Sequence, residues 1–159
     1  MIEKATKTDI QEIVKLAKIT REHMIESGIN QWTGDYPNKL HFLSDLENKG
    51  LFVYKQDNLI VATVSLLPEN DQAYKEISWK KNNSLVIHRV IVNPAYQNLG
   101  IGKELFSLAY RIGKLNGYES IKVDTHPENN KMQGLIISQG YNYRGYLTSI
   151  NRLAYERVI

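Results

Sequence analysis

The sequence contains no cysteine, and this absence excludes disulfide bonds, thiolate metal sites and cysteine nucleophiles. It also contains no apolar run of the roughly 20 residues that a membrane-spanning helix needs. The first residues, MIEK, lack the apolar core of a signal peptide. We therefore expect a cytoplasmic protein with no membrane partner.

Clusters of one kind of charge are also missing. Twenty Lys and Arg stand against 17 Asp and Glu, which gives a net charge of +3, and the densest basic pair is only Lys80-Lys81. Nucleic-acid-binding domains usually gather their basic residues, so we expect no nucleic-acid partner. The four histidines, at positions 23, 41, 88 and 126, are dispersed, and no His-Glu-x-x-His motif occurs. We expect no metal site.

What the chain does have is the composition of a globular protein. Its 159 residues are 42% hydrophobic and 23% charged, and no linker or low-complexity tract divides them. A chain of this length usually forms one domain, so we expect a single domain over residues 1–159.

Hydrophobic periodicity predicts an α+β protein in which helices and strands are mixed. Thr8 is the expected N-cap of the first helix, with Gln11 completing a capping box. Gly28, Gly50, Gly117 and Gly140 mark helix ends. The predicted helices cover residues 8–28, 37–50, 100–116 and 129–139, and the predicted strands cover 2–5, 51–54, 59–67, 84–92, 120–124, 141–146 and 151–158.

The most informative stretch is a strand that leads through a glycine-containing turn into a helix. The strand ends near Val92, and the turn and helix start follow as Gln97-Asn98-Leu99-Gly100-Ile101-Gly102-Lys103. The first turn of a helix leaves backbone N–H groups without acceptors and carries partial positive charge, so it can bind a pyrophosphate. Glycines let the backbone approach that anion closely, and Lys103 adds a cation.

Three kinds of phosphate-binding turn can be compared with this stretch. A Walker A loop fails, because position 97 is Gln and Glu104 stands where Ser or Thr is needed. A dinucleotide fingerprint lacks its third glycine, since position 105 is Leu. The pattern Gln/Arg-x-x-Gly-x-Gly/Ala after a strand is satisfied in full, although a glycine turn that merely starts a helix would have the same sequence.

Several features together resemble the GNAT superfamily of acyl-CoA-dependent N-acetyltransferases. They are the strand HRVIV with Asn93-Pro94, the Gln97-x-x-Gly-x-Gly turn, Asp124-Thr125-His126 at a strand end, Asn129, and Gly140-Tyr141. The resemblance extends over nearly the whole chain. It implies a mixed, mostly antiparallel sheet of six to seven strands, flanked by about four helices, with a splayed central strand pair. Trp32, Tyr36-Pro37 and the segment 74–79 are similar to a bacterial branch without an assigned substrate.

The resemblance also implies a site for acetyl-CoA as cosubstrate. The splayed strand would bind the pantetheine arm by added-strand hydrogen bonds, the glycine turn would bind the pyrophosphate, and Asn129 (or Asn130, if the register slips by one) would contact the cofactor arm. The cofactor-binding residues expected on this basis are Val90, Ile91, Val92, Gln97, Asn98, Leu99, Gly100, Ile101, Gly102, Lys103 and Asn129.

Acetyl transfer needs a base for the acceptor amine, a donor to the thioester oxygen and an acid for the thiolate. His88 is the expected base, because it lies on the strand beside the thioester and shares a face with Val86 and Val90 by strand alternation. A histidine buried for structural reasons, and His126 or Asp124 as bases, stay open. The expected oxyanion donor is a backbone N–H at Val90 or Ile91.

At the position of the residue that would protonate the thiolate, the sequence differs from the family pattern. Many family members have a tyrosine seven residues after the helix asparagine. That position is Ile136 here. Another group, such as Tyr96, Tyr141 or Tyr143, could protonate the thiolate, or it could leave unassisted. A coenzyme A-binding module without turnover is the alternative to an enzyme.

The acceptor is a primary amine that the sequence does not identify, in a small molecule or a peptide. Trp32, Tyr36 and Trp79 would flank its cleft, either as walls that contact the amine or as packing residues. Small domains with edge strands often dimerise, so a homodimer stays open.

Overall fold

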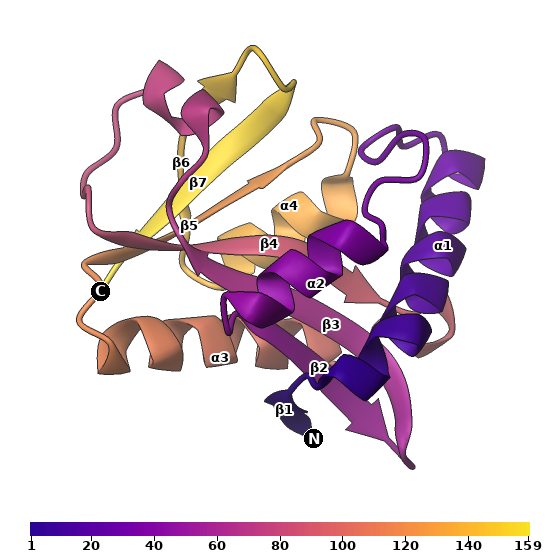
Figure 1. Cartoon of the computed structure of the whole chain (residues 1–159). Helices are drawn as coiled ribbons and strands as arrows, with labels where there is room; N and C mark the ends of the chain where they lie inside the picture. The colour runs from indigo at the N-terminus through magenta and orange to yellow at the C-terminus, as the bar shows by residue number, and fades with distance from the viewer. The chain divides into compact units, whose positions relative to one another are not determined.

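A computed structural model describes all 159 residues, and its strands form a seven-stranded sheet in the order β1-β2-β3-β4-β5-β7-β6 (Figure 1). The pairs β1–β2, β2–β3, β5–β7 and β6–β7 are antiparallel, and β4–β5 is parallel. The expected α+β fold, with a mixed and mostly antiparallel sheet of six to seven strands, is therefore confirmed. The strands are β1 (Ile2–Lys4), β2 (Leu51–Gln56), β3 (Leu59–Pro68), β4 (Ser84–Val92), β5 (Ser120–Thr125), β6 (Asn142–Leu147) and β7 (Arg152–Val158).

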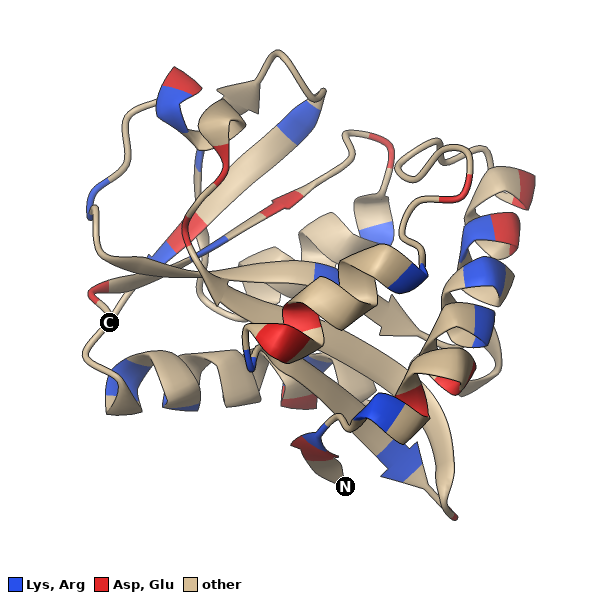
Figure 2. Ribbon diagram, in the orientation of Figure 1, with Lys and Arg blue, Asp and Glu red and all other residues tan.

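Four α-helices accompany the sheet, as expected. They are α1 (Ile10–Glu26), α2 (Lys39–Glu47), α3 (Ile101–Leu115) and α4 (Asn130–Ser138), and short 3₁₀ turns cover Lys7–Asp9 (η1), Gln72–Glu76 (η2) and Pro94–Tyr96 (η3). No helix is long and apolar enough to cross a bilayer. Basic and acidic residues are interspersed along the ribbon (Figure 2).

The start of α1 differs from the prediction. The N-cap of α1 is Asp9, and the capping box is formed by Thr6 rather than Thr8: the Thr6 N–H donates to the Asp9 carboxylate at 2.8 Å. A 3₁₀ turn, Lys7–Asp9, precedes the helix. The Glu/Gln form of the capping-box pattern matches only Thr8 with Gln11, whereas the box in the structure uses Asp9, whose carboxylate reaches the Thr6 N–H.

The chain forms two compact units. Unit 1 contains Met1–Leu67 and His88–Leu105, and unit 2 contains Pro68–Ile87 and Phe106–Ile159. The chain passes between them inside three elements: β3 changes unit between Leu67 and Pro68, β4 between Ile87 and His88, and α3 between Leu105 and Phe106.

Unit 1 has its core where α1 and α2 pack on the strands. Ile13 and Ala17 of α1, Phe42 of α2, Val53 of β2 and Ile91 of β4 are fully buried in one hydrophobic cluster. The hairpin β2–β3 turns at Asp57 and Asn58, and both residues have the positive φ that a tight two-residue hairpin turn requires. Because Ile91 belongs to this cluster, the second half of β4 packs on the core of unit 1.

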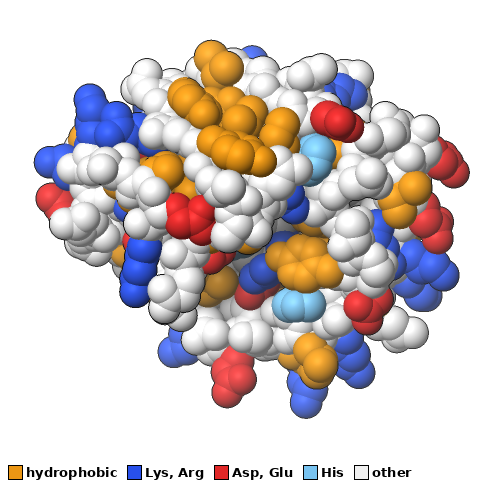
Figure 3. Space-filling view, turned by 90° about the horizontal axis from the view of Figure 1, so that it is seen from above, with side chains coloured by type: hydrophobic (Ala, Val, Ile, Leu, Met, Phe, Trp, Pro, Cys, Tyr) orange, Lys and Arg blue, Asp and Glu red, His pale blue; other side chains and the backbone are white.

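Unit 2 has a small apolar cluster and many buried polar side chains. Tyr74 packs with Val86, Leu147 and Ala154, while Lys122 and Glu156 are fully buried on β5 and β7. Its edge strand β6 exposes Tyr143 and Tyr146. Hydrophobic side chains form patches on the face of the molecule shown in Figure 3.

Candidate functional site

The pairing and the backbone conformation of β4 both change in the middle of the strand. Its parallel register with β5 consists of four pairs, from Ser84↔Ser120 to Ile87↔Val123. Two residues later, Arg89 has a φ of +51°, a left-handed conformation that is unusual for a residue with a side chain. The left-handed residue interrupts the strict alternation of faces from which we predicted that His88 and Val90 share a side. His88 itself is half-buried.

Arg89 is held by a dense set of contacts within unit 1. Its Nε donates to Asp45 Oδ2 at 2.8 Å and its Nη2 to Asp45 Oδ1 at 2.5 Å, while Nη1 donates to the Tyr36 hydroxyl at 3.0 Å. The Ser65 hydroxyl donates to Asp45 Oδ2 at 2.6 Å. The side chains of Arg89 and Asp45 are only 12% and 3% exposed. The left-handed turn in β4 is therefore tied to α2 and to β3.

The predicted phosphate-binding turn opens α3, as expected. Asn98 and Gly100 have φ values of +64° and +83°, with the exposed Leu99 between them. The helix begins at Ile101, so the N–H groups of its first turn have no intrahelical acceptors. A Cβ at Gly100 would have no heavy atom within 4 Å. This turn and the end of β4 both belong to unit 1, so the predicted residues 90–92 and 97–103 lie in one compact body.

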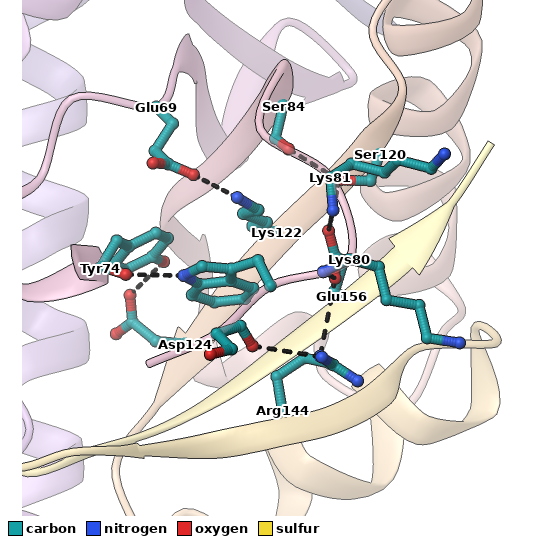
Figure 4. A network of polar contacts seen from close by, with 12 residues as sticks. Glu69, Tyr74, Lys80, Lys81, Ser84, Ser120, Lys122, Asp124, Arg144 and Glu156 are labelled. Carbon is teal, nitrogen blue, oxygen red and sulfur yellow. Dashed lines mark hydrogen bonds and ion pairs between the residues drawn. The ribbon is translucent and has the colours of Figure 1, made fainter. Parts of the chain in front are cut away.

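The alternative bases are in unit 2, at the end of β5. Asp124 accepts a hydrogen bond from the Tyr74 hydroxyl at 2.6 Å, as Figure 4 shows, and it lies 3.9 Å from Arg152. Burial raises the pKa of Asp124 above its ordinary value, and the bond from Tyr74 and the charge of Arg152 oppose that rise. Asp124 is thus a carboxylate whose ionisation is made less favourable by the fold.

The His126 ring makes a hydrogen bond to the backbone two residues further along the chain. Its Nδ1 accepts from the N–H of Glu128 at 3.1 Å, and the side chain is buried. Burial lowers the pKa of His126, and the nearby Arg152 lowers it further. The ring is therefore neutral at pH 7, with its proton on Nε2 because Nδ1 is an acceptor.

The three predicted aromatic residues each have a packing contact. Trp32 is buried in the core of unit 1. Tyr36 contacts the His41 ring edge-on at 4.6 Å in addition to binding Arg89. Trp79, in unit 2, stacks on Tyr74 at 5.0 Å and donates its indole N–H to the Tyr74 carbonyl at 2.6 Å. Whether these residues also flank an acceptor cleft stays a prediction.

Asn129 caps a helix. Its side-chain oxygen accepts from the N–H of Met132 at 3.1 Å, and Asn130 is the first residue of α4. Ile136, at the position of the family tyrosine, is fully buried on the same helix. No group of three or more His, Asp or Glu side chains is arranged to hold a metal ion.

Sequence reasoning missed the buried polar groups. In unit 2, Lys122 is bonded to Glu69 and lies 4.5 Å above the Trp79 ring, and Glu156 accepts from the backbone N–H groups of Lys80 and Lys81 (Figure 4). The sequence does carry one signal for them, which is the alternation of polar and apolar residues along β5. Lys122 and Asp124 alternate with Ile121 and Val123, so β5 has one polar face.

Comparison with known proteins adds independent information. The profile described as Acetyltransferase (GNAT) family matches residues 16–141. The chain is 25% identical over 142 residues to the uncharacterized N-acetyltransferase YesJ of Bacillus subtilis, which covers 86% of this chain and 78% of that protein.

Solved structures share the fold. A GNAT family acetyltransferase of Streptococcus agalactiae superimposes with a TM-score of 0.84 at 23% identity, over 100% of this chain and 95% of its own. The PaiA N-acetyltransferase of Thermoplasma acidophilum, solved in complex with coenzyme A, superimposes with a TM-score of 0.77 at 15% identity, over 100% and 98%. With a family match over most of its length and the same strand–turn–helix arrangement, this chain belongs to the GNAT family of acetyltransferases.

Proposed function

We propose that the protein transfers an acetyl group from acetyl-CoA to a primary amine of a small molecule or peptide by direct attack on the thioester. The observation that carries this proposal is the turn at Asn98 and Gly100, which follows β4, opens α3 and lies in the same compact unit as the end of β4 in a GNAT-family chain. The absence of cysteine fits a mechanism without a thiol nucleophile.

Acetyl-CoA would be bound mainly by main-chain groups. Val90 to Val92 would pair with the pantetheine arm, and the N–H groups of Gly100 to Lys103 would face the pyrophosphate. Exposure supports this assignment: Asn98, Leu99, Gly100 and Lys103 are exposed and Val90 and Val92 are half-buried. Asn129 would contact the cofactor arm.

The reaction needs a hydrogen-bond donor where negative charge develops on the thioester oxygen. The N–H of Val90 or Ile91 would supply it, since these residues directly follow the left-handed turn at Arg89. No side-chain oxyanion donor is then required.

His88 remains the proposed base, with Asp124 and His126 as its rivals. His88 is half-buried at the point where β4 leaves its register with β5, whereas His126 uses Nδ1 to stabilise a turn. We expect His88→Ala to lower turnover roughly 10²–10⁴-fold. Wild-type turnover in a folded His88→Ala protein would transfer the role to Asp124 or His126.

The position of the family tyrosine offers the thiolate no proton donor, because Ile136 is an apolar core residue. The thiol of coenzyme A is fairly acidic, so we propose that the thiolate leaves without a dedicated acid. Water or the main chain would then stabilise it.

The direct test has two parts. Acetyl-CoA at about 100 times its Kd should stabilise the fold by roughly 2.7 kcal/mol, which raises the Tm of a chain of this size by roughly 5–10 °C. Thiol release across a panel of primary amines should then reveal at least one acceptor. Unchanged melting in saturating acetyl-CoA would contradict the proposal.

The buried Ile136 also favours a second candidate, a coenzyme A-binding module without turnover. This candidate predicts the same melting shift with no thiol release from any amine. Turnover with a single amine would exclude it.

The remaining expectations stay predictions. A single functional domain over residues 1–159 is supported by the family match, which begins in unit 1 and ends in unit 2. A cytoplasmic location fits the use of acetyl-CoA, and a homodimer stays open.

A further inference from the structure

We propose that Arg89 is a positioning residue, and that Asp45 and Tyr36 form a clamp on it that holds the left-handed turn of β4 ready for acetyl-CoA. This inference rests on the proposed function. It assigns Tyr36 to the support of the cofactor strand instead of the wall of the acceptor cleft.

The geometry of the clamp is specific. Both edges of the Arg89 guanidinium are engaged: Nε and Nη2 face the two oxygens of Asp45, and Nη1 faces the Tyr36 hydroxyl. Asp45 is in turn fixed by the Ser65 hydroxyl. A planar, two-pronged ion pair of this kind fixes orientation as well as distance, so it determines where the Arg89 backbone lies.

Energetics also argue for a function. A buried ion pair is expensive to desolvate and is often no more stable than an apolar replacement. A left-handed conformation at a residue with a side chain adds further strain. Strain of this kind concentrates at functional sites, and here it directly precedes the strand residues that would bind the thioester.

The clamp acts on Val90. Arg89 is held on one side by Asp45, and Ile91 on the other side is fully buried in the core of unit 1. The half-buried Val90 lies between these two anchors. Its peptide groups therefore have a fixed direction before any ligand arrives, and preorganised groups lose less entropy on binding.

Substitution of Arg89 by glycine distinguishes a positioning role of its side chain from direct contact with acetyl-CoA. Alanine at position 89 loses the clamp and disfavours a positive φ, whereas glycine loses the clamp but adopts a positive φ freely. We expect Arg89→Ala to weaken acetyl-CoA binding roughly 5- to 30-fold, in line with the cost of the left-handed conformation. Arg89→Gly should weaken binding clearly less than Arg89→Ala, because glycine adopts the positive φ without strain although the clamp no longer holds it there.

The measurement is the Kd of acetyl-CoA by calorimetry, well below the Tm of each variant, so that only folded protein is compared. Lys49, an exposed left-handed residue after α2, provides the control: Lys49→Ala and Lys49→Gly should change stability and leave the Kd unchanged. If Arg89→Ala does not fold, Tyr36→Phe removes one hydrogen bond and should still weaken binding about threefold, as the loss of one modest bond predicts.

The outcomes are distinct. Wild-type affinity in Arg89→Ala, or in Tyr36→Phe where that variant stands in for it, would overturn the clamp. Equal weakening in Arg89→Ala and Arg89→Gly would also overturn it, because the side chain would then act directly. Absence of binding by the wild-type protein would overturn the proposed function itself, and the inference with it.

Discussion

Asp45 and Arg89 form a buried ion pair, so the loss of one charge should be costly. Asp45→Asn leaves the Arg89 guanidinium buried without its counter-charge, and we expect the free energy of unfolding to fall by roughly 3–5 kcal/mol. Urea unfolding measures this change in the free energy of unfolding. The matched control is Glu3→Gln, which removes an exposed partner of Lys55 and should cost less than about 1 kcal/mol. Equal effects of the two variants would contradict the burial argument.

Asp124 should give the fold a pH dependence of the opposite sign to a typical salt-bridged carboxylate. Because burial raises its pKa, the folded state binds the proton more tightly than the unfolded state. Its contribution to stability is then present below the unfolded pKa of about 3.9 and is lost as pH rises through the folded pKa.

Asp124→Asn removes this titration and keeps an acceptor for the Tyr74 hydroxyl. We expect the difference in Tm, Asp124→Asn minus wild type, to become more positive as the pH rises above about 4. A difference in Tm that is constant from pH 3 to pH 8 would contradict the raised pKa. Thermal melts across that range provide the measurement.

At the scale of the element, local patterns predicted the secondary structure well. The bounds of β4 agree with the prediction, and α3 begins one residue after Gly100. These elements have strong local signals, namely β-branched residues closed by Asn93-Pro94 and an amphipathic helix after a glycine turn. The capping box was predicted two residues late, at Thr8 instead of Thr6, because the pattern applied to the sequence pairs a threonine with Glu or Gln and the box in the structure uses Asp9.

The site was less predictable, for a physical reason. Residues 90–92 and 97–103 follow from a contiguous motif, but the left-handed Arg89 depends on Asp45, which is 44 positions away. No local pattern contains that information. Tyr36 likewise resembles a cleft aromatic in the sequence, and its bond to Arg89 is visible only after folding.

Two glycines that flank α3 permit a controlled test of the phosphate-binding turn. Gly100 before the helix and Gly117 after it both have positive φ and open space around a Cβ. Aspartate at either position meets the same backbone strain and adds the same charge, but only Gly100 adjoins the helix N-terminus. We expect Gly100→Asp to abolish the melting shift with acetyl-CoA, because its carboxylate repels the pyrophosphate.

In this comparison Gly117→Asp should melt at a lower temperature and keep the full shift. The shift is measured by thermal unfolding with and without acetyl-CoA. A Gly100→Asp protein that keeps it would show that the anion is bound elsewhere.

At the scale of the whole molecule, the chain divides its expected functions between two units. Unit 1 contains the proposed cofactor residues except Asn129, together with His88 and the Arg89 clamp, and unit 2 contains Asp124 and His126. The elements β3, β4 and α3 each contribute residues to both units. The central claim therefore concerns unit 1: its main-chain amides bind acetyl-CoA.

The most direct measurement of that claim is a set of ¹H–¹⁵N spectra recorded as acetyl-CoA is added to the labelled protein. The amides of Val90, Ile91 and residues 99–103 should show the largest shifts, and the amide of Gly117 should not move. If saturating acetyl-CoA leaves the amides of 90–91 and 99–103 in place, or shifts only amides of unit 2, the account is wrong.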